Sequence, residues 1–251
     1  MSVVLAIDVG LKNLAMCIGC PSNHGDICQI LLWNVYDLLS EKTFLCQFEQ
    51  KNKKICNKKT SCVFTIDNKI VHSCKTHCTK DSNVKVKPVK QKKVDSYLLQ
   101  DIAKIIIKKL DELYLNNSVF NQVTEIIIEL QPKINPKSLF FSHVIYTKLV
   151  HLYINSDCKI RFIRASQKLK AYNGPEMQCH LKNKYSQRKW LSIQYTRWFL
   201  ENKFSGTEKE KWFDFFNSCK KQDDISDCLL YIIKNLTDTL NKTDKKGKCI
   251  K

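Results

Sequence analysis

Residues 3–10 read Val3-Val4-Leu5-Ala6-Ile7-Asp8-Val9-Gly10, five apolar residues that lead into an aspartate and a Val-Gly turn. An apolar run of this length predicts a buried strand, and the glycine after it permits a sharp reversal of the chain. An ionised carboxylate buried without a partner costs several kcal/mol, so Asp8 requires a cation, a metal or hydrogen-bond donors. The alternative is that Asp8 only caps the turn at 9–13.

The segments that follow predict an α/β chain. Residues 15–20 and 29–36 are short apolar runs divided by turn residues, which together with the first run indicates an antiparallel three-stranded meander. The later periodicities predict a helix from Asp95 to Leu113, a central strand at 123–130, a helix from Asn135 to Ile154, a strand at 160–164, and helices at 185–202 and 222–236. This order of elements predicts a mixed sheet flanked by helices.

Length and composition limit the possible classes of protein. A chain of 251 residues with 43% hydrophobic residues suits one large domain, or one domain with an insertion. No apolar run approaches the roughly 20 residues that a membrane span requires, and the first apolar run carries Asp8 and lacks a basic start. We therefore expect an intracellular protein with no membrane partner.

The charge of the chain predicts a polyanionic partner. The net charge is +18, and 38 of the 42 basic residues are lysines. Nucleic acid is the first candidate for such a protein, and a merely basic protein from a lysine-rich proteome is the alternative. The thirteen cysteines of an intracellular chain indicate thiols or metal ligands rather than disulfides.

Composition also predicts the domain boundaries. From Lys51 to Lys93 there are thirteen lysines and only two acidic residues, and several cysteines and histidines lie in and just before this stretch. We expect a zinc-binding insertion at 44–80 and a basic linker at 81–94. The main domain then comprises 1–43 and 95–240, and the lysine-rich end, 241–251, is expected to be a disordered tail.

The insertion contains a pattern typical of structural zinc sites. Cys74 and His77 form a Cys-x₂-His pair, and Cys46 and Cys56 complete a Cys₃His set of the kind that binds zinc tetrahedrally. A short, polar segment cannot bury enough apolar surface to fold alone, which favours a structural metal. Three further side chains are alternative ligands: Cys62, His72 and Cys78. The lysines of the insertion could bind the DNA backbone through their charge, or they could be only the solvated face of a structural unit.

Further carboxylates occupy positions as unusual as that of Asp8. Glu129 ends the buried run at 126–128, and three aspartates crowd the start of the last helix, where Asp224 and Asp227 are three residues apart and share one face. Acidic residues in a first helical turn can also serve only to complement the helix dipole. If four carboxylates converge, they would suit hard divalent cations and two-metal phosphodiester hydrolysis.

Three acidic blocks together resemble those of the RNase H-like RuvC superfamily: Ala6-Ile7-Asp8-Val9-Gly10-Leu11-Lys12-Asn13, Ile127-Ile128-Glu129-Leu130-Gln131-Pro132 and Lys221-Gln222-Asp223-Asp224-Ile225-Ser226-Asp227. Blocks at 165–172 and 185–189 agree with them. The set is most similar to the Holliday junction resolvases of poxviruses and related large DNA viruses, and covers most of 3–43 and 95–236. The resemblance implies an RNase H-like fold, and the zinc insertion resembles one in large-virus relatives that compact poxvirus forms lack.

The resemblance implies a metal site. Asp8 matches the first-strand aspartate of the family, Glu129 its fourth-strand glutamate, and Asp224 and Asp227 its final aspartate pair. These residues would bind two Mg²⁺ (or Mn²⁺) ions in each active site. Asp223 lies one position before the first aspartate of this pair, and we expect it to lie beside the metal ligands rather than to bind the metal.

The resemblance also implies roles for basic residues. The family uses an active-site lysine between the glutamate and the last aspartates, for which Lys189 is our first choice, with Lys168 and Lys170 as alternatives. Such a lysine would stabilise charge on the scissile phosphate. Phosphate contacts to DNA are predicted for four basic residues: Lys12, Lys168, Lys170 and Arg188.

The activity implied is metal-dependent cleavage of four-way and branched DNA junctions, leaving 5′-phosphate and 3′-hydroxyl ends. A four-way junction is two-fold symmetric, so paired cuts predict a homodimer; a viral source would place the protein in the host cytoplasm or the virion. The alternatives are an RNase H-like nuclease acting on RNA or an RNA–DNA hybrid, and a non-catalytic zinc-dependent DNA-binding protein. An actin-like ATPase would need further glycine motifs, and the chain has only six glycines.

Overall fold

The computed structural model describes most of the chain, namely residues 2–22, 27–39, 44–50, 52–79, 81, 83–89 and 97–247, with side chains as far as Thr239. The chain forms two compact units. The larger one combines Met1–Leu38 with Leu99–Lys251, and the smaller one, here called the insertion unit, is Leu39–Leu98.

The larger unit is built on a five-stranded sheet in the order β3-β2-β1-β7-β8. The antiparallel meander expected from the sequence is present, and β1 continues it by pairing in parallel with β7, which pairs in parallel with β8. The strand bounds are β1 (Val4–Val9), β2 (Asn13–Cys20), β3 (Gln29–Asp37), β7 (Glu125–Leu130) and β8 (Lys159–Arg164). A meander extended by two parallel strands on the side of its first strand is the RNase H-like arrangement. The fold is RNase H-like.

The first turn of the meander depends on a glycine. A Cβ atom on Gly10 would lie 2.3 Å from the backbone oxygen of Asn13, closer than non-bonded atoms can approach. Only glycine therefore fits at position 10 of the turn between β1 and β2, as the Val-Gly turn in the sequence predicted.

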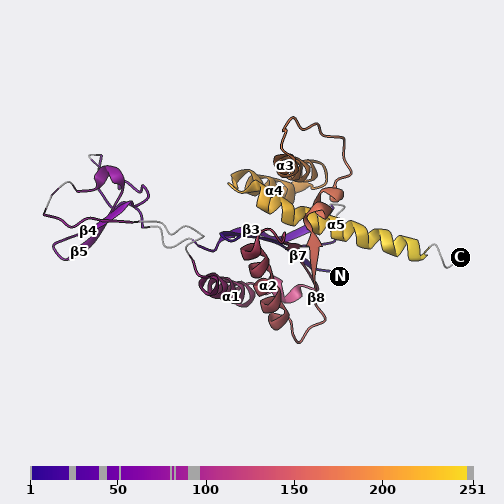
Figure 1. The fold of residues 1–251 in the computed structure, drawn as a ribbon. Coiled ribbons are helices and arrows are strands. Elements are labelled where there is room, and N and C mark those ends of the chain that lie inside the picture. The colour runs from indigo at the N-terminus through magenta and orange to yellow at the C-terminus, as the bar shows by residue number, and fades with distance from the viewer. Residues whose placement is uncertain are drawn as a thin grey trace. The chain divides into compact units, whose positions relative to one another are not determined.

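Helices cover both faces of the sheet (Figure 1). On one face, α2 packs on β1, β7 and β8, and α1 packs on α2. On the other face, α5 lies across β1, β2 and β3, and α3 and α4 pack against α5. The helix bounds are α1 (Leu99–Asn116), α2 (Pro136–Leu152), α3 (Lys184–Asn202), α4 (Gly206–Ser218) and α5 (Gln222–Gly247).

Helix α5 supplies the centre of the core. Its apolar side meets side chains of β1 and β2, including the fully buried Val4, Ala6 and Cys17. The buried residues include all those predicted for this helix face from its period: Ile225, Leu229, Ile232, Ile233 and Leu236. The position of α5 on the sheet is therefore set by hydrophobic burial.

A single tryptophan joins β3 to the start of α5. The indole N–H of Trp33 donates a buried hydrogen bond of 2.9 Å to the backbone oxygen of Ile225. The same ring stacks on Phe216 of α4, with centroids 5.8 Å apart and planes 9° apart, and meets Trp212 edge-on. Trp33 thus fixes both α4 and the first turn of α5.

The sequence located most helices but missed one. Helix α2 begins as predicted, with Pro136 in its first turn and the Asn135 side chain accepting a 3.2 Å hydrogen bond from the amide of Ser138. Helix α4 was not predicted, because its buried residues, Trp212 and Phe216, stand among charged side chains. Helix α5 continues past 236 to Gly247, so residues 241–247 are helical rather than part of a disordered tail, and 248–251 lie outside the described residues.

The insertion unit contains a small antiparallel sheet in the order β5-β4-β6. A 3₁₀ turn, η1, follows β5 in the chain. The bounds are β4 (Cys62–Ile66), β5 (Lys69–Ser73), η1 (Lys75–His77) and β6 (Lys87–Pro88). The short β6 lies within 81–94, which was expected to be only a linker, and Ser82 and 90–94 of that segment lie outside the described residues.

Replacing Trp33 by phenylalanine keeps an aromatic ring but removes the buried hydrogen bond from the indole to the Ile225 oxygen. We expect Trp33→Phe to lower the free energy of unfolding by about 1–3 kcal/mol, measured by urea denaturation. Trp198→Phe is the control, because the Trp198 indole donates no hydrogen bond to a described residue and only ring area is lost. Equal losses in the two variants would contradict the anchoring role of Trp33.

Candidate active site and metal centre

The parallel pairing of β1 with β7 brings two carboxylates together. The register aligns Ile7 with Ile128, so the next residues, Asp8 and Glu129, lie side by side at the carboxyl ends of the two strands. Ala6 and Ile127 contribute to the core beneath α5. Because side chains alternate along a strand, Asp8 and Glu129 also point to the α5 face.

The first turns of α5 place two further carboxylates above this pair. Asp224 and Asp227 are three residues apart and therefore share one helix face. Burial raises the pKa of Asp8 well above its usual value, and the negative charges of Glu129, Asp227 and Asp224 raise it further. Asp8 thus lies within electrostatic reach of the other three predicted metal-binding carboxylates.

A lysine lies among three of these carboxylates, Asp8, Glu129 and Asp227. The 3₁₀ segment η4 (Ala165–Ala171) follows β8 and turns Lys168 inward, where its side chain is only 11% exposed. The Lys168 ammonium donates a 3.1 Å hydrogen bond to Glu129 Oε2 and a second, short one to Asp227 Oδ2. Desolvation favours the neutral amine, but the charges of Asp227 and Glu129 outweigh it and raise the pKa of Lys168 above its usual value.

Two hydroxyl groups hold the carboxylates in place. The Tyr231 hydroxyl donates a 2.6 Å hydrogen bond to Glu129 Oε2, and the Ser192 hydroxyl of α3 donates one of the same length to Asp227 Oδ1. Burial raises the pKa of the Tyr231 phenol far above its usual range, and the charge of Glu129 adds to this effect, so Tyr231 remains a donor. Neither residue was predicted from the sequence, although Tyr231 lies four positions after Asp227 on the same helix face.

Burial and mutual repulsion shift the aspartates of α5. Burial raises the pKa of Asp227 to about 6, where the charge of Glu129 adds to the shift and that of Lys168 opposes it. Burial also raises the pKa of Asp224, together with the charge of Asp223. Raised carboxylate pKa values of this kind arise where burial brings like charges together, an arrangement found in functional sites and in structural ion-pair networks.

The first-choice lysine lies elsewhere. Lys189 pairs with Asp223, and its ammonium lies 5.1 Å from the centre of the Tyr185 ring, so it joins the flank of the site. Lys168, predicted both as an alternative active-site lysine and as a DNA contact, is buried among the carboxylates and presents no free surface charge. The sequence could not make this distinction, because both lysines lie between Glu129 and the last aspartates.

The other predicted DNA contacts lie at the surface. Lys170 and Arg188 are exposed. Lys12, in the turn after Asp8, forms an exposed ion pair of 3.5 Å with Asp37 of β3. Their positions are compatible with phosphate contacts, which remain a prediction.

The donor set suits a hard divalent cation. Asp8, Glu129, Asp224 and Asp227 offer oxygen ligands only, which Mg²⁺ and Mn²⁺ prefer. The four carboxylates carry more negative charge than Lys168 can balance, and cations would compensate the remainder. The residues present therefore fit the ions that the motif resemblance implies.

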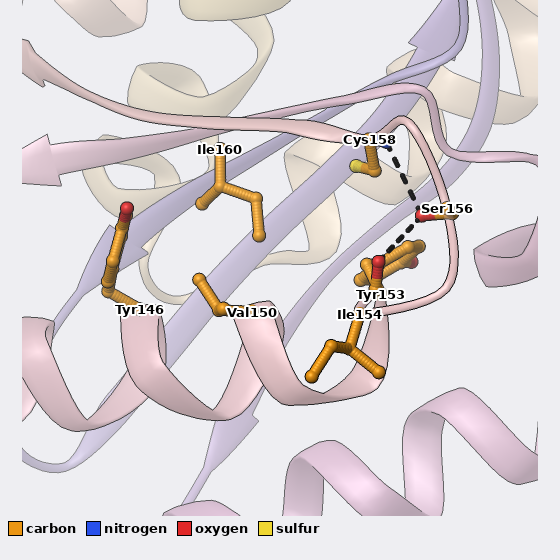
Figure 2. A pocket seen from close by; sticks show the side chains of 7 residues that line it. All are labelled: Tyr146, Val150, Tyr153, Ile154, Ser156, Cys158 and Ile160. Atoms are coloured by element: carbon orange, nitrogen blue, oxygen red, sulfur yellow. Dashed lines mark hydrogen bonds between the residues drawn. The ribbon is translucent and has the colours of Figure 1, made fainter.

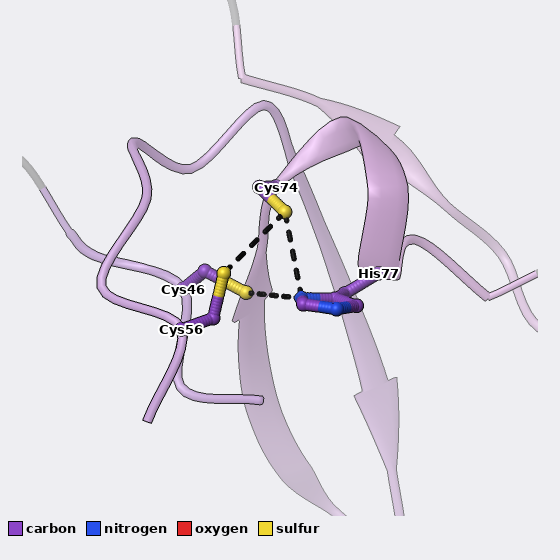
Figure 3. A group of neighbouring side chains, drawn as sticks. All are labelled: Cys46, Cys56, Cys74 and His77. Atoms are coloured by element: carbon purple, nitrogen blue, oxygen red, sulfur yellow. Dashed lines mark hydrogen bonds between the residues drawn. The ribbon is translucent and has the colours of Figure 1, made fainter. Parts of the chain in front are cut away.

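A second group of ligands lies in the insertion unit. The side chains of Cys46, Cys56, Cys74 and His77 point toward one another (Figure 3), and their ligand atoms all lie within 4.8 Å of each other. Cys46 and Cys56 come from facing segments joined by the bridges Leu45–Lys59 and Glu49–Ile55, and η1 begins directly after Cys74. This is the predicted Cys₃His set.

The distances within this set match a tetrahedral site. A zinc ion about 2.3 Å from sulfur and 2.0–2.1 Å from nitrogen separates two sulfurs by about 3.8 Å and a sulfur from a nitrogen by about 3.5 Å. Cys56 and Cys74 sulfurs are 3.9 Å apart, and His77 Nδ1 lies 3.5 Å from Cys46 and 3.6 Å from Cys74. The contacts drawn in Figure 3 are therefore the edges of a possible zinc tetrahedron.

The alternative ligands lie outside this group. Cys62 Sγ lies 3.1 Å from the hydroxyl of Ser73, and His72 stacks on Phe44. Within the Cys₃His group, desolvation opposes ionisation of Cys74, but hydrogen bonds from the backbone of His77 and Thr76 outweigh it and lower the pKa of Cys74 to about 7. A lowered thiol pKa favours the thiolate that binds zinc.

A pocket of about 270 Å³ in the larger unit is lined by residues between Tyr146 and Ile160, near the end of α2 and the start of β8 (Figure 2). Lys168 follows the opposite end of β8, so this pocket is not part of the carboxylate site.

No helix in the part of the chain that the structure describes has the length and apolar character needed to cross a membrane.

Comparisons with known proteins give distant relatives. No protein-family model matches the chain. The uncharacterized protein L451 of Acanthamoeba polyphaga mimivirus is 25% identical over 329 aligned residues, covering 99% of this chain and 78% of that protein.

Similar solved structures include three resolvases. Fowlpox virus resolvase, solved with Holliday junction DNA, is 15% identical with a TM-score of 0.45, covering 93% of this chain and 98% of that chain. Yeast mitochondrial Ydc2 is 14% identical with a TM-score of 0.48, covering 94% and 79%, and Thermus thermophilus RuvC is 9% identical with a TM-score of 0.47, covering 95% and 96%. All three are Holliday junction resolvases. These neighbours are of the kind that the acidic blocks resemble, and the fold itself follows from the strand order of this chain.

Removing the central lysine should destabilise the metal-free protein. In the presence of EDTA, we expect Lys168→Met to lower the free energy of unfolding by about 3–5 kcal/mol, because Glu129 and Asp227 lose their buried counter-charge. Mg²⁺ should restore part of this loss. The matched control, Lys189→Met, breaks the more exposed pair with Asp223 and should cost at most about 1 kcal/mol. Similar costs in urea denaturation would refute the central position of Lys168.

Zinc content distinguishes the Cys₃His group from the alternative ligands. We expect one zinc ion per wild-type chain by atomic emission, close to none in Cys74→Ser, and one in Cys78→Ser. The loss follows from removing one of four ligands, on which folding of such a unit depends. Zinc loss in Cys78→Ser alone would mean that a different set of ligands is used.

Proposed function

We propose that this protein is a metal-dependent, structure-specific DNA endonuclease that resolves four-way and branched junctions. The observation that supports the proposal is the gathering of Asp8, Glu129 and Asp227 around Lys168, with Asp224 within electrostatic reach of Asp8, at the carboxyl ends of the parallel strands. The choice of junctions as substrate rests on the ordered acidic blocks, which resemble those of viral resolvases.

The four carboxylates would hold two Mg²⁺ or Mn²⁺ ions. When bound, these ions would supply an activated water and neutralise charge on the scissile phosphate. Tyr231 and Ser192 keep one oxygen each of Glu129 and Asp227 in a fixed direction, which preserves the ligand arrangement. The ammonium of Lys168 is placed to stabilise negative charge that builds on the phosphate.

DNA binding is supported by charge. The chain carries a net charge of +18, and the exposed Lys170 and Arg188 belong to the segments on either side of the 173–183 loop. We assign phosphate contacts to these residues and to Lys12, and a catalytic role to Lys168 in place of Lys189. Two symmetric cuts would require a homodimer.

We also propose that two parts of the chain have different roles. Residues 1–43 and 95–240 form the nuclease domain, and 44–80 form an insertion in which Cys46, Cys56, Cys74 and His77 bind a structural Zn²⁺. The S···S and S···N distances within this group support the choice of zinc.

Cleavage of a labelled synthetic four-way junction with Mg²⁺ tests the proposal, beside a linear duplex and an RNA–DNA hybrid. We expect paired nicks in the junction, no cleavage after Glu129→Gln or Asp227→Asn, and a roughly 100- to 1,000-fold lower rate after Lys168→Met. Asp223→Asn is the matched control and should keep most of the activity, because Asp223 pairs with Lys189 outside the central group.

Each other outcome has a definite meaning. Cleavage of the hybrid instead of the junction would keep the metal site and replace the substrate. Tight DNA binding without cleavage of any substrate would make the protein a zinc-dependent DNA-binding protein and reduce the carboxylates to a structural role.

A further inference from the structure

The insertion unit exposes two aromatic rings beside its Cys₃His group. Phe44 is 53% exposed and Phe48 is 50% exposed, whereas Cys46 between them is fully buried. The segment pairs with the facing one through backbone hydrogen bonds at each of these residues, to Thr60, Lys58 and Cys56. In an extended segment, alternate residues share a side, so both rings flank the buried ligand.

Each ring is held by a histidine. Phe44 stacks on His72 with ring centres 4.0 Å apart and planes 7° apart, and Phe48 stacks on His77 at 4.2 Å and 17°. One face of each phenylalanine is therefore covered and its orientation fixed. A further flat ring could stack on the remaining surface with little loss of side-chain freedom.

The unit that carries the two rings is strongly basic. Residues 39–98 contain fourteen lysines and five acidic residues, which gives this unit half of the excess positive charge of the whole chain. The backbone oxygen of Lys58 accepts a hydrogen bond from the amide of Cys46, which places Lys58 opposite Cys46 on the side of the rings, whereas Lys59 is opposite Leu45 on the other side. The lysines that the structure describes between residues 52 and 60 are all exposed: Lys53, Lys54, Lys58 and Lys59.

We propose that Phe44 and Phe48, with the lysines of the facing segment, form a binding site for unpaired nucleotides of a single strand. Bases would stack on the phenylalanine rings while the lysines contact the phosphates, a combination that binds single strands with little sequence preference. Duplex DNA hides its base faces and can use only the lysines. This site goes beyond the proposed nuclease activity and does not depend on it, because it uses no residue of the carboxylate group.

Anisotropy of a labelled oligo(dT), without divalent cations, tests the site in the full-length chain. We expect Phe44→Ala to weaken binding by about 5- to 150-fold, the range found when a stacking ring is removed. Binding to a duplex should change less than about twofold, since charge alone governs it. An oligo(U) probe run in parallel shows whether RNA serves equally well.

Two variants serve as controls. Phe44→Tyr keeps the ring and should retain affinity for the single strand. Ile70→Ala removes an apolar side chain that is 66% exposed on β5 and should have no effect. Phe44 is the informative position, since its partner His72 lies outside the Cys₃His group, and an unchanged zinc content shows that the unit remains folded.

Several results would overturn the site. One is that Phe44→Ala and the Phe44→Ala/Phe48→Ala double variant bind the single strand with wild-type affinity. Another is that they lose affinity equally for the single strand and the duplex. A loss of self-association in sedimentation velocity, with oligonucleotide binding unchanged, would assign the rings to contact with a second copy of the chain. Glu129→Gln should bind oligo(dT) as wild type does, which separates this test from that of the nuclease.

Discussion

The parallel pairing of β1 with β7 is the constraint on which the site depends. It places Asp8 and Glu129 on strands about 4.8 Å apart, where two negative charges repel each other by about 3 kcal/mol at an effective dielectric constant near 20. The fold supplies partners for this pair from two other elements, Lys168 from η4 and Tyr231 from α5. Without them the cost of placing two carboxyl groups at the ends of these adjacent strands would be larger.

Helix α5 links the stability of the fold to the geometry of the site. Its apolar side is the centre of the core, and its first turns carry Asp224 and Asp227. Trp33 fixes those turns through the Ile225 oxygen, while Asn235 and Arg161 join the later part of the helix to Glu125 of β7 and to β8. The core therefore holds the carboxylates in a position that their own repulsion would disfavour, as is common where function and stability compete.

The sequence predicted the sheet, most helices and the four carboxylates, because each leaves a local signal. An apolar run that ends in an acidic residue, or two aspartates three positions apart, can be read without knowledge of the fold. Lys168 and Ser192 leave no such signal, since their roles arise only when η4 and α3 pack against α5. Helix α4 was missed for a related reason: its few buried rings are explained only by Trp33, which lies far away in the sequence.

The insertion unit lies between β3 and α1 in the chain, and β3 is an edge strand of the five-stranded sheet. A segment that leaves from an edge strand can lengthen without breaking any pairing within the sheet, and the entropy cost of closing a loop grows only slowly with its length. The connection is thus a natural point of modular variation. A lineage can gain, lose or exchange whatever lies there while the arrangement of the carboxylates is inherited unchanged.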